Sequence, residues 1–286
     1  MPRLLWLAGF LAFAAAAQPR LEVTSPLGTK FYSLPDDKGA VAQAEKALAA
    51  DPKDPGLLLK LAQAQISVWQ DREAVATLTR ALEIKPDDAA LLTERGHREL
   101  PLREFAKAEA DLDRASRLDP NRMDAWYHLG LARYFQGKFA PAAEAFRRAA
   151  ATAPNPDEII NATNWVYAAC RRAGQTADAA RAIAAIPPEM KNQAPHTEHY
   201  LNLVRLFQGG KTESAILPLE PPAGNSDDET ELRFDTVAYG IGNWHLYNGD
   251  AALAEEYFRR VLKGHVWITW GFIGSEVEVA RAAKSR

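Results

Sequence analysis

The sequence predicts an all-α fold, an α-solenoid built from stacked antiparallel helix pairs. The first observation is a row of prolines at a constant interval of 34 residues: Pro52, Pro86, Pro120 and Pro154. The second is that alanines keep the same interval five and twelve residues before each of these prolines. The third is that alanine is abundant while β-branched residues are sparse over long stretches. This favours helices, because alanine loses no side-chain entropy on entering one. A period of this length indicates repeats that bury their apolar faces only against one another.

One unit shows how the interval translates into two helices. Residues 124–136 and 138–151 are expected to be helical, with Gly137 at the turn between them. Glycine can adopt the positive φ that ends the first helix. Gly130 and Ala142 are small, so the two helices can approach closely where they cross. The unit is therefore predicted to be an antiparallel helix pair that stacks on its neighbours.

The same unit carries a recognisable set of residues at fixed positions. They are Trp126, Leu129, Gly130, Gly137, Ala142, Phe146, Ala149 and Pro154. This set resembles the tetratricopeptide-repeat consensus at nearly every signature position. The units at 55–88 and 89–122 resemble it too, but the second departs at Arg95, where the family prefers an apolar residue. It departs again at Pro101, which is expected to shorten its first helix. The resemblance implies a superhelical scaffold that binds a protein or peptide.

The N-terminus has the pattern of a secretory signal peptide. Arg3 precedes an uncharged apolar run from Leu4 to Ala17, which ends in three alanines. The alternative is a membrane anchor, but a spanning helix needs about 20 apolar residues. We therefore expect cleavage near Ala17, no membrane span in the mature chain, and an exported bacterial protein that is periplasmic or secreted. Whether the segment is removed or retained as an anchor stays open.

The rest of the chain divides by how closely it follows the repeat. Residues 18–37 are expected to be extended, because they contain β-branched and aromatic residues between prolines. Residues 38–189 are predicted to be repeats, and 190–286 to be divergent helical pairs of the same type. Trp267–Ala283 is expected to form a terminal helix that caps the last exposed face of the array. Leu217–Glu231 is expected to be an exposed loop, since it contains three prolines and five acids.

Composition argues against several classes of function. The formal charge is −3, from 34 basic and 37 acidic residues, so nothing favours nucleic acid as a partner. The single cysteine, Cys170, excludes an intramolecular disulfide, and its apolar neighbours predict a buried side chain. Gly240 and Gly242 are not followed by the third glycine of a dinucleotide-binding motif, and no strand precedes them. We expect no cofactor, no metal and no catalytic residues.

An enzyme is the alternative hypothesis. Its site would lie in the less regular part, 190–286, and would use His196, His199, His245 or His265. His196 and His199 are three residues apart, whereas the paired histidines of zinc proteases are four apart on a helix. The hypothesis requires these histidines to converge in the folded chain.

The first helices of successive units contain a candidate binding stripe. Their positions 2, 5, 9 and 12 recur at spacings of 3, 4 and 3 residues, so they share one face, which lines the groove in tetratricopeptide-like packing. The candidate peptide-binding residues are Thr93, His97, Tyr127, His128, Tyr134, Asn161, Asn164 and Arg171. Tyrosine and arginine are frequent interface anchors, and asparagine can pair with an extended backbone. The alternative is that Tyr127 and Tyr134 only pack between units. The partner itself is unknown.

Overall fold

The fold is described by a computed structural model, which covers residues 18–194, 197–217 and 227–284. The repeats are pairs of an inner helix and an outer helix: α2 (Pro55–Ile66) with α3 (Asp71–Ile84), α4 (Ala89–Glu99) with α5 (Phe105–Leu118), α6 (Met123–Phe135) with α7 (Phe139–Thr152), and α8 (Pro156–Arg172) with α9 (Thr176–Ala184). Before them come strands β1 (Leu21–Thr24) and β2 (Lys30–Tyr32) and helix α1 (Ala40–Leu48). After them come α10 (Glu198–Phe207), α11 (Glu213–Ile216), α12 (Asp228–Tyr247), α13 (Ala251–Val261) and α14 (Trp270–Lys284). Helices therefore make up nearly all of the regular secondary structure of the described chain, as predicted.

Three of the four inner helices begin at a polar side chain that caps them. Asp54 and Asp88 stand one repeat apart, and each side chain accepts hydrogen bonds from backbone N–H groups of the first helical turn. The shortest of these bonds is 2.7 Å long at Asp54 and 3.0 Å long at Asp88. Asn155 does the same for α8, at 3.0 Å. These caps satisfy N–H groups that have no partner inside the helix.

The small residues lie where helices cross, as the repeat predicts. A Cβ added to Gly130 would come within 2.5 Å of the Phe146 ring, so α6 and α7 can pack this closely only with glycine there. Ala142 is fully buried at the same crossing. Gly242 stands in the same relation to Phe258, at 2.7 Å, between α12 and α13. The pair α12–α13 therefore repeats the packing of the earlier units.

The turn between the helices of a unit requires a left-handed backbone. Gly137 has φ 80°, as its position predicts. The equivalent positions one and two repeats earlier are occupied by Arg103, with φ 60°, and Trp69, with φ 56°. A side chain in this region is strained, because its Cβ crowds the backbone. Two units thus retain a strained residue where glycine would be relaxed.

The two departures from the repeat consensus have local explanations. Arg95 forms a two-pronged ion pair with Asp111 of α5, at 2.5 and 2.8 Å, in place of an apolar contact between the helices. Helix α4 ends at Glu99, two residues before Pro101. The expected shortening of this helix is confirmed.

After α9 the chain turns back instead of continuing the stack. Pro187 and Pro188 follow α9 and cannot extend a helix. The guanidinium of Arg205, on α10, donates to the backbone carbonyls of Pro187 at 2.9 Å and Met190 at 3.1 Å. The reversal is therefore held by hydrogen bonds from the helix that follows it.

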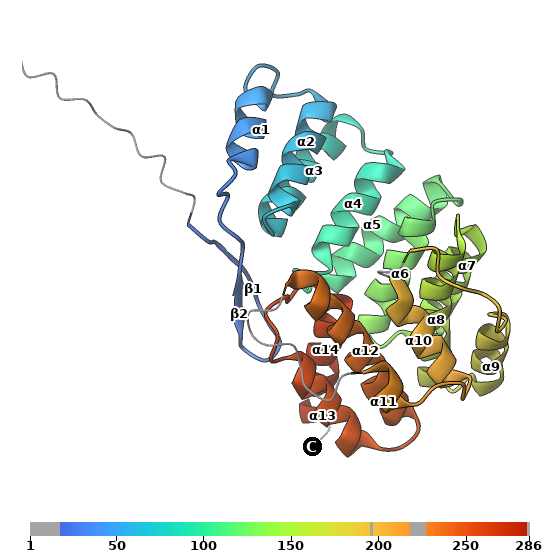
Figure 1. The fold of residues 1–286 in the computed structure, drawn as a ribbon. Coiled ribbons are helices and arrows are strands. Elements are labelled where there is room, and N and C mark those ends of the chain that lie inside the picture. The colour runs from blue at the N-terminus through green and yellow to red at the C-terminus, as the bar shows by residue number, and fades with distance from the viewer. Residues whose placement is uncertain (1–17, 195–196, 218–226, 285–286) are drawn as a thin grey trace, which may run out of the picture.

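The C-terminal helices lie against the inner helices of the array. Figure 1 shows α1 to α9 following one another around an arc, with α12 and α14 beside its inner side. Trp270, at the start of α14, contacts the rings of His97 on α4 and His128 on α6. Helix α14 also packs on α12 and α13, the last helix pair of the described chain. It therefore covers this pair on one side and lies against the inner helices on another, where Trp270 and Glu276 find partners.

The N-terminal hairpin joins the two ends of the described chain. Strands β1 and β2 are antiparallel, and the Phe31 ring stacks on that of Trp267 with centroids 5.5 Å apart. Val23 and Phe31 belong to the same apolar cluster as Phe234 and Phe272 of the C-terminal helices. The segment 18–37 thus contacts the C-terminal helices, while its Asp36 carboxylate caps the start of α1.

Several expectations fall on residues outside the described ranges. These are the signal peptide at 1–17, His196, and residues 218–226 of the expected loop. The described end of that loop is helical, because α12 already begins at Asp228. Among the described residues, no helix is both long enough and apolar enough to cross a bilayer.

Candidate functional site

The predicted stripe lies on the inner helices α4, α6 and α8, but most of it is covered. We call this side the inner face, meaning the side of α2, α4, α6 and α8 that carries Gln63, His97, Tyr134 and Arg171. Five of the eight candidate residues are less than a tenth exposed: Thr93, Tyr127, His128, Tyr134 and Asn164. His97, Asn161 and Arg171 are half-buried.

The first covered part of the inner face is an aromatic slot. The rings of His97 and His128 stack with centroids 3.9 Å apart, and Trp270 of α14 lies 5.4 and 5.7 Å from them. Nδ1 of His128 lies 2.9 Å from the carbonyl oxygen of Asp124, which can only accept, so this nitrogen carries the proton. Burial lowers the pKa of His128 to about 3, and burial together with the neighbouring His128 lowers the pKa of His97 well below its usual value. Both rings are therefore neutral at pH 7, so the indole of Trp270 packs against two uncharged aromatic rings.

The second part is a chain of hydrogen bonds that crosses from the array to the C-terminal helices. The amide nitrogen of Asn243 on α12 donates to the hydroxyl oxygen of Tyr134 at 2.7 Å. The amide oxygen of Asn243 accepts from Arg172 at 3.2 Å, and Arg172 pairs with Glu278 of α14 at 2.9 Å. All four groups are buried or nearly so. Tyr134 therefore contacts α12 rather than solvent.

The third part surrounds Arg171 at the end of α8. Its guanidinium donates to the carbonyl of Tyr247 at 3.2 Å and to the side chain of Asn248 at 2.6 Å. It also lies 4.7 Å from the ring centroid of Tyr247. The donors expected to bind a peptide are thus already used by the end of α12.

The stripe residues lie on the inner helices, as predicted, but the larger part of them is buried. Tyr134 and Asn164 are buried, and the end of α12 already uses the donors of Arg171. The reason is that the chain turns back after α9 and provides its own partner for these groups. A role in binding stays a prediction for the stripe. The first unit remains open: Gln63, one repeat before His97, is exposed, and Leu59 beside it is half-buried.

Arg103 is an important residue that the sequence reasoning missed. Its guanidinium pairs with Glu276 of α14, donating from Nε at 2.9 Å, and donates to the carbonyl of Trp267 at 3.2 Å. The two side chains of the pair are only 6% and 2% exposed. The guanidinium also lies 5.6 Å from the Phe31 ring and 5.5 Å from the Trp267 ring. Trp69 meets Trp267 edge-on at 6.0 Å.

The sequence contains a sign of the contact that Arg103 and Trp69 make with the C-terminal helices. Arg103 and Trp69 occupy the repeat position at which Gly137 turns the chain. A large side chain at a position that prefers glycine indicates a contact strong enough to keep it there.

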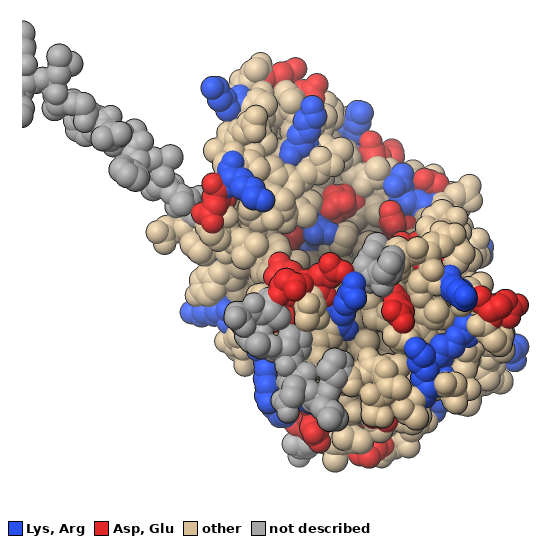
Figure 2. Space-filling model, in the orientation of Figure 1, with Lys and Arg blue, Asp and Glu red and all other residues tan. Residues whose placement is uncertain are grey.

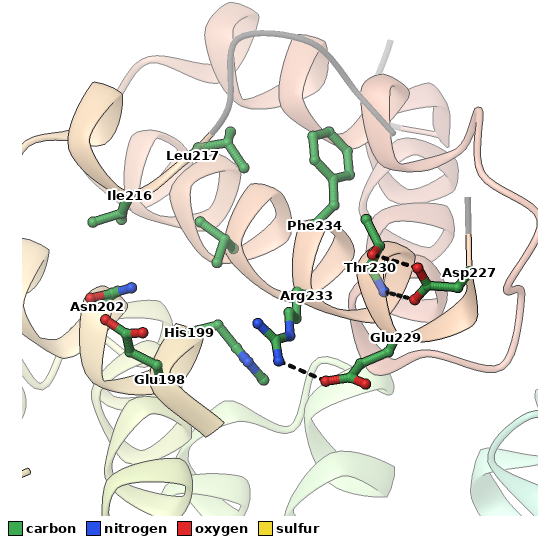
Figure 3. A pocket seen from close by; sticks show the side chains of 11 residues that line it. Glu198, His199, Asn202, Ile216, Leu217, Asp227, Glu229, Thr230, Arg233 and Phe234 are labelled. Atoms are coloured by element: carbon green, nitrogen blue, oxygen red, sulfur yellow. Dashed lines mark hydrogen bonds and ion pairs between the residues drawn. The ribbon is translucent and has the colours of Figure 1, made fainter. Parts of the chain in front are cut away.

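A separate pocket of about 640 Å³ opens between α10 and α12. Its apolar side is formed by Leu217, Phe234 and Val237, and acidic residues stand at its rim. Figure 3 shows Arg233 turned toward Glu229, with which it forms an ion pair of 2.6 Å. Glu229 is therefore engaged within α12 itself, and Asp227 accepts a hydrogen bond from the backbone N–H of Thr230.

The histidines of the enzyme hypothesis are spread over the C-terminal part. His265 pairs with Glu231 at 2.6 Å, at the first turns of α12, whereas His245 pairs with Glu213 at 2.9 Å from the last turn. Glu231 and His245 are 14 positions apart in α12, which places these sites about 21 Å apart along the helix. His199 lines the pocket between α10 and α12 without either of them. Among the described residues, no group of three His, Cys, Asp or Glu side chains could hold a metal ion. His245 and His265 therefore do not meet the requirement of the enzyme hypothesis.

Cys170 is buried, as predicted. Burial raises the pKa of its thiol, although an N–H group of Arg147 lies 3.2 Å from the sulfur. A thiol with a raised pKa is a poor nucleophile.

Figure 2 shows acidic and basic side chains interspersed over the visible face, which offers no basic patch for a phosphate backbone.

Comparisons with known proteins identify the repeats. Two family models of the tetratricopeptide repeat match residues 38–93 and 93–156. Solved structures similar to part of the chain include two crystal structures of MamA. One is 26% identical, covering 51% of this chain and 83% of that one with a TM-score of 0.47. The other is 25% identical, covering 51% and 79% with a TM-score of 0.47. A form designated MamA AMB-1 is 21% identical, covering 52% and 86% with a TM-score of 0.46. The sequence has no significant match among curated proteins.

Proposed function

Because this chain is a tetratricopeptide-repeat protein, with repeats over residues 38–156, we propose that it is an exported, non-enzymatic scaffold that binds another protein through its inner face. The repeats themselves support a protein-interaction scaffold. The proposal adds where the scaffold works, what it does not do, and which surface it uses.

One observation carries the choice of surface. The inner face already holds helices of this chain through side chains that reach across to them, among them His97, Tyr134 and Arg103. A face that holds a helix by aromatic and charged anchors has the composition of a protein-binding site. The exposed Gln63 and half-buried Leu59 extend this face beyond the part that is filled.

Two further observations support the absence of catalysis. His245 and His265 engage separate carboxylates. At the rim of the pocket between α10 and α12, Glu229 pairs with Arg233 and Asp227 caps the start of α12. Catalytic groups normally meet at one place with a nucleophile, a base and an orienting group within hydrogen-bond reach. Export rests on the signal-peptide pattern of residues 1–17 alone.

Site-specific photo-crosslinking tests the binding surface. A photoreactive residue at Gln63, on the inner face, is compared with one at Arg148, whose side chain is 63% exposed on the outer helix α7. Full-length protein is irradiated in its native cells. We expect a discrete protein adduct from position 63 and none from position 148. Equal labelling at both positions, or none at either, contradicts the proposal.

N-terminal sequencing tests export. The mature protein is expected to begin near Gln18 and to be recovered outside the cytoplasm. A membrane-bound product that keeps Met1 would instead make the segment an anchor.

A further inference from the structure

We propose that the inner face of α4, α6 and α8 is a recognition site for a helix that carries an indole and, six and eight residues later, two carboxylates. Helix α14 fills this site within the chain, through Trp270, Glu276 and Glu278, and a protein partner with the same pattern competes for it. This rests on the proposed function and names the class of partner for the same face. We call α12 to α14, residues 228–284, the C-terminal unit.

Charge complementarity supports an acidic occupant. Arg103 lies in the turn between α4 and α5 and Arg172 ends α8, and their side chains are 6% and 12% exposed. Each is paired with one carboxylate of α14, Arg103 with Glu276 and Arg172 with Glu278. An arginine this deeply buried needs a carboxylate partner, because an unpaired charge is costly to bury. The face therefore selects helices that bring an acid to each of these two arginines.

The aromatic slot supports an indole in the occupant. His97 and His128 form a stacked pair, and the Trp270 ring lies 5.4 Å from the first and 5.7 Å from the second, measured between centroids. Neutral aromatic rings in this arrangement accept another flat ring at an edge or a tilt. The slot lies on α4 and α6, whereas one arginine follows α4 and the other ends α8. The slot and the arginines therefore contact separate parts of the bound helix.

Backbone strain indicates that the contact has a role beyond filling space. Trp69 and Arg103 keep the left-handed conformation that glycine would adopt without strain. Both side chains turn to the same place: Trp69 meets Trp267, and Arg103 pairs with Glu276. A non-glycine residue keeps a strained backbone where the contacts of its side chain outweigh the cost of the strain. Here those contacts are made with the C-terminal unit.

The contact between the C-terminal unit and the array combines an apolar core with the polar and aromatic anchors. Tyr239 and Ile273 pack in the same apolar cluster as Trp165 of α8. Phe234 and Phe272 pack in a second cluster, which includes Leu203 of α10. Many of the unit's contacts with the inner face are made by polar or aromatic side chains, as with Asn243 and Trp270. Exchange of such an internal helix for an external one requires a partner that supplies the same anchors.

A labelled peptide of residues 265–284 provides the test on the full-length protein. In the variant Glu276→Lys, the introduced charge repels Arg103 and weakens the internal contact, while Arg103 remains free to pair with the peptide. We expect the peptide to bind this variant at least tenfold more tightly than the wild type, measured by fluorescence anisotropy. The matched control is Glu256→Lys, an exposed residue of α13 in the same unit, which should bind the peptide as weakly as the wild type. A peptide with Glu276→Lys and Glu278→Lys should not bind any of these proteins.

A second variant guards against misfolding. The exchange Arg103→Glu with Glu276→Lys restores the ion pair in reverse, so it should be folded by circular dichroism and closed to the wild-type peptide. The proposal is overturned if the folded Glu276→Lys variant does not gain peptide binding, or if the exchange variant binds like it. Dimers of Glu276→Lys without peptide binding would show that the face takes a second copy instead. Crosslinking at Gln63 would still report protein binding in either case, so the two proposals fail independently.

Discussion

Replacing Arg103 by methionine removes a buried cation and leaves its partner in place. The carboxylate of Glu276 is 2% exposed, and its ion pair with Arg103 lies under the rings of Phe31 and Trp267. Breaking one partner of a buried pair typically costs about 3–5 kcal/mol, because the other charge stays buried without compensation. We expect a loss of this size in the free energy of unfolding of Arg103→Met, measured by urea denaturation.

A double-mutant cycle isolates the interaction energy between Arg103 and Glu276. The double variant Arg103→Met, Glu276→Met replaces both charges by apolar groups and is expected to lie within about 1–2 kcal/mol of the wild type. The coupling energy between the two positions should then exceed about 2 kcal/mol. A coupling below about 0.5 kcal/mol would refute the claim that this pair holds α14 to the array. Methionine and arginine are both strained at the φ of 60° found at position 103. The backbone strain therefore cancels when the two are compared.

The repeat phase is tested by Ala142→Arg and Glu144→Arg: the first forces a charge into the fully buried crossing of α6 and α7 and should cost several kcal/mol, whereas the second, at a side chain 59% exposed, should cost less than about 1 kcal/mol. Similar melting temperatures of the two variants would place the repeat boundaries elsewhere. The slot is tested by His128→Phe: because burial lowers the folded pKa of His128 to about 3, only the unfolded chain takes up its proton below pH 6.5. The wild type should therefore lose about 1.4 kcal/mol relative to His128→Phe for each pH unit from 6.5 down to about 4, and parallel stability curves would contradict this.

Much of the array could be predicted because its determinants are local or recur in neighbouring units. Gly130 is needed where α6 crosses α7, Gly137 where the chain reverses, and Asp54 and Asp88 where helices begin. Each of these acts within one repeat. The constant repeat interval therefore makes them visible in the sequence itself.

The candidate site could be predicted only in part. The repeat fixes which side of α4, α6 and α8 carries Thr93, Tyr134 and Arg171, and these residues do lie on that side. Whether the side is open depends on residues more than a hundred positions away, such as Asn243, which bonds to Tyr134. No periodicity relates the two, so their pairing is invisible in the sequence.

The sequence by itself determined the helix pairs, their phase, and the face that each first helix presents. The tertiary structure alone decided that the chain folds back on this face and fills it. The physical reason is that contacts within a repeat span few residues and leave a pattern. The contact of Arg103 with Glu276 instead spans 173 positions and depends on a reversal after α9, held by hydrogen bonds from Arg205. Even so, the position of Arg103 in the repeat, where glycine is the relaxed choice, was the visible trace of that contact.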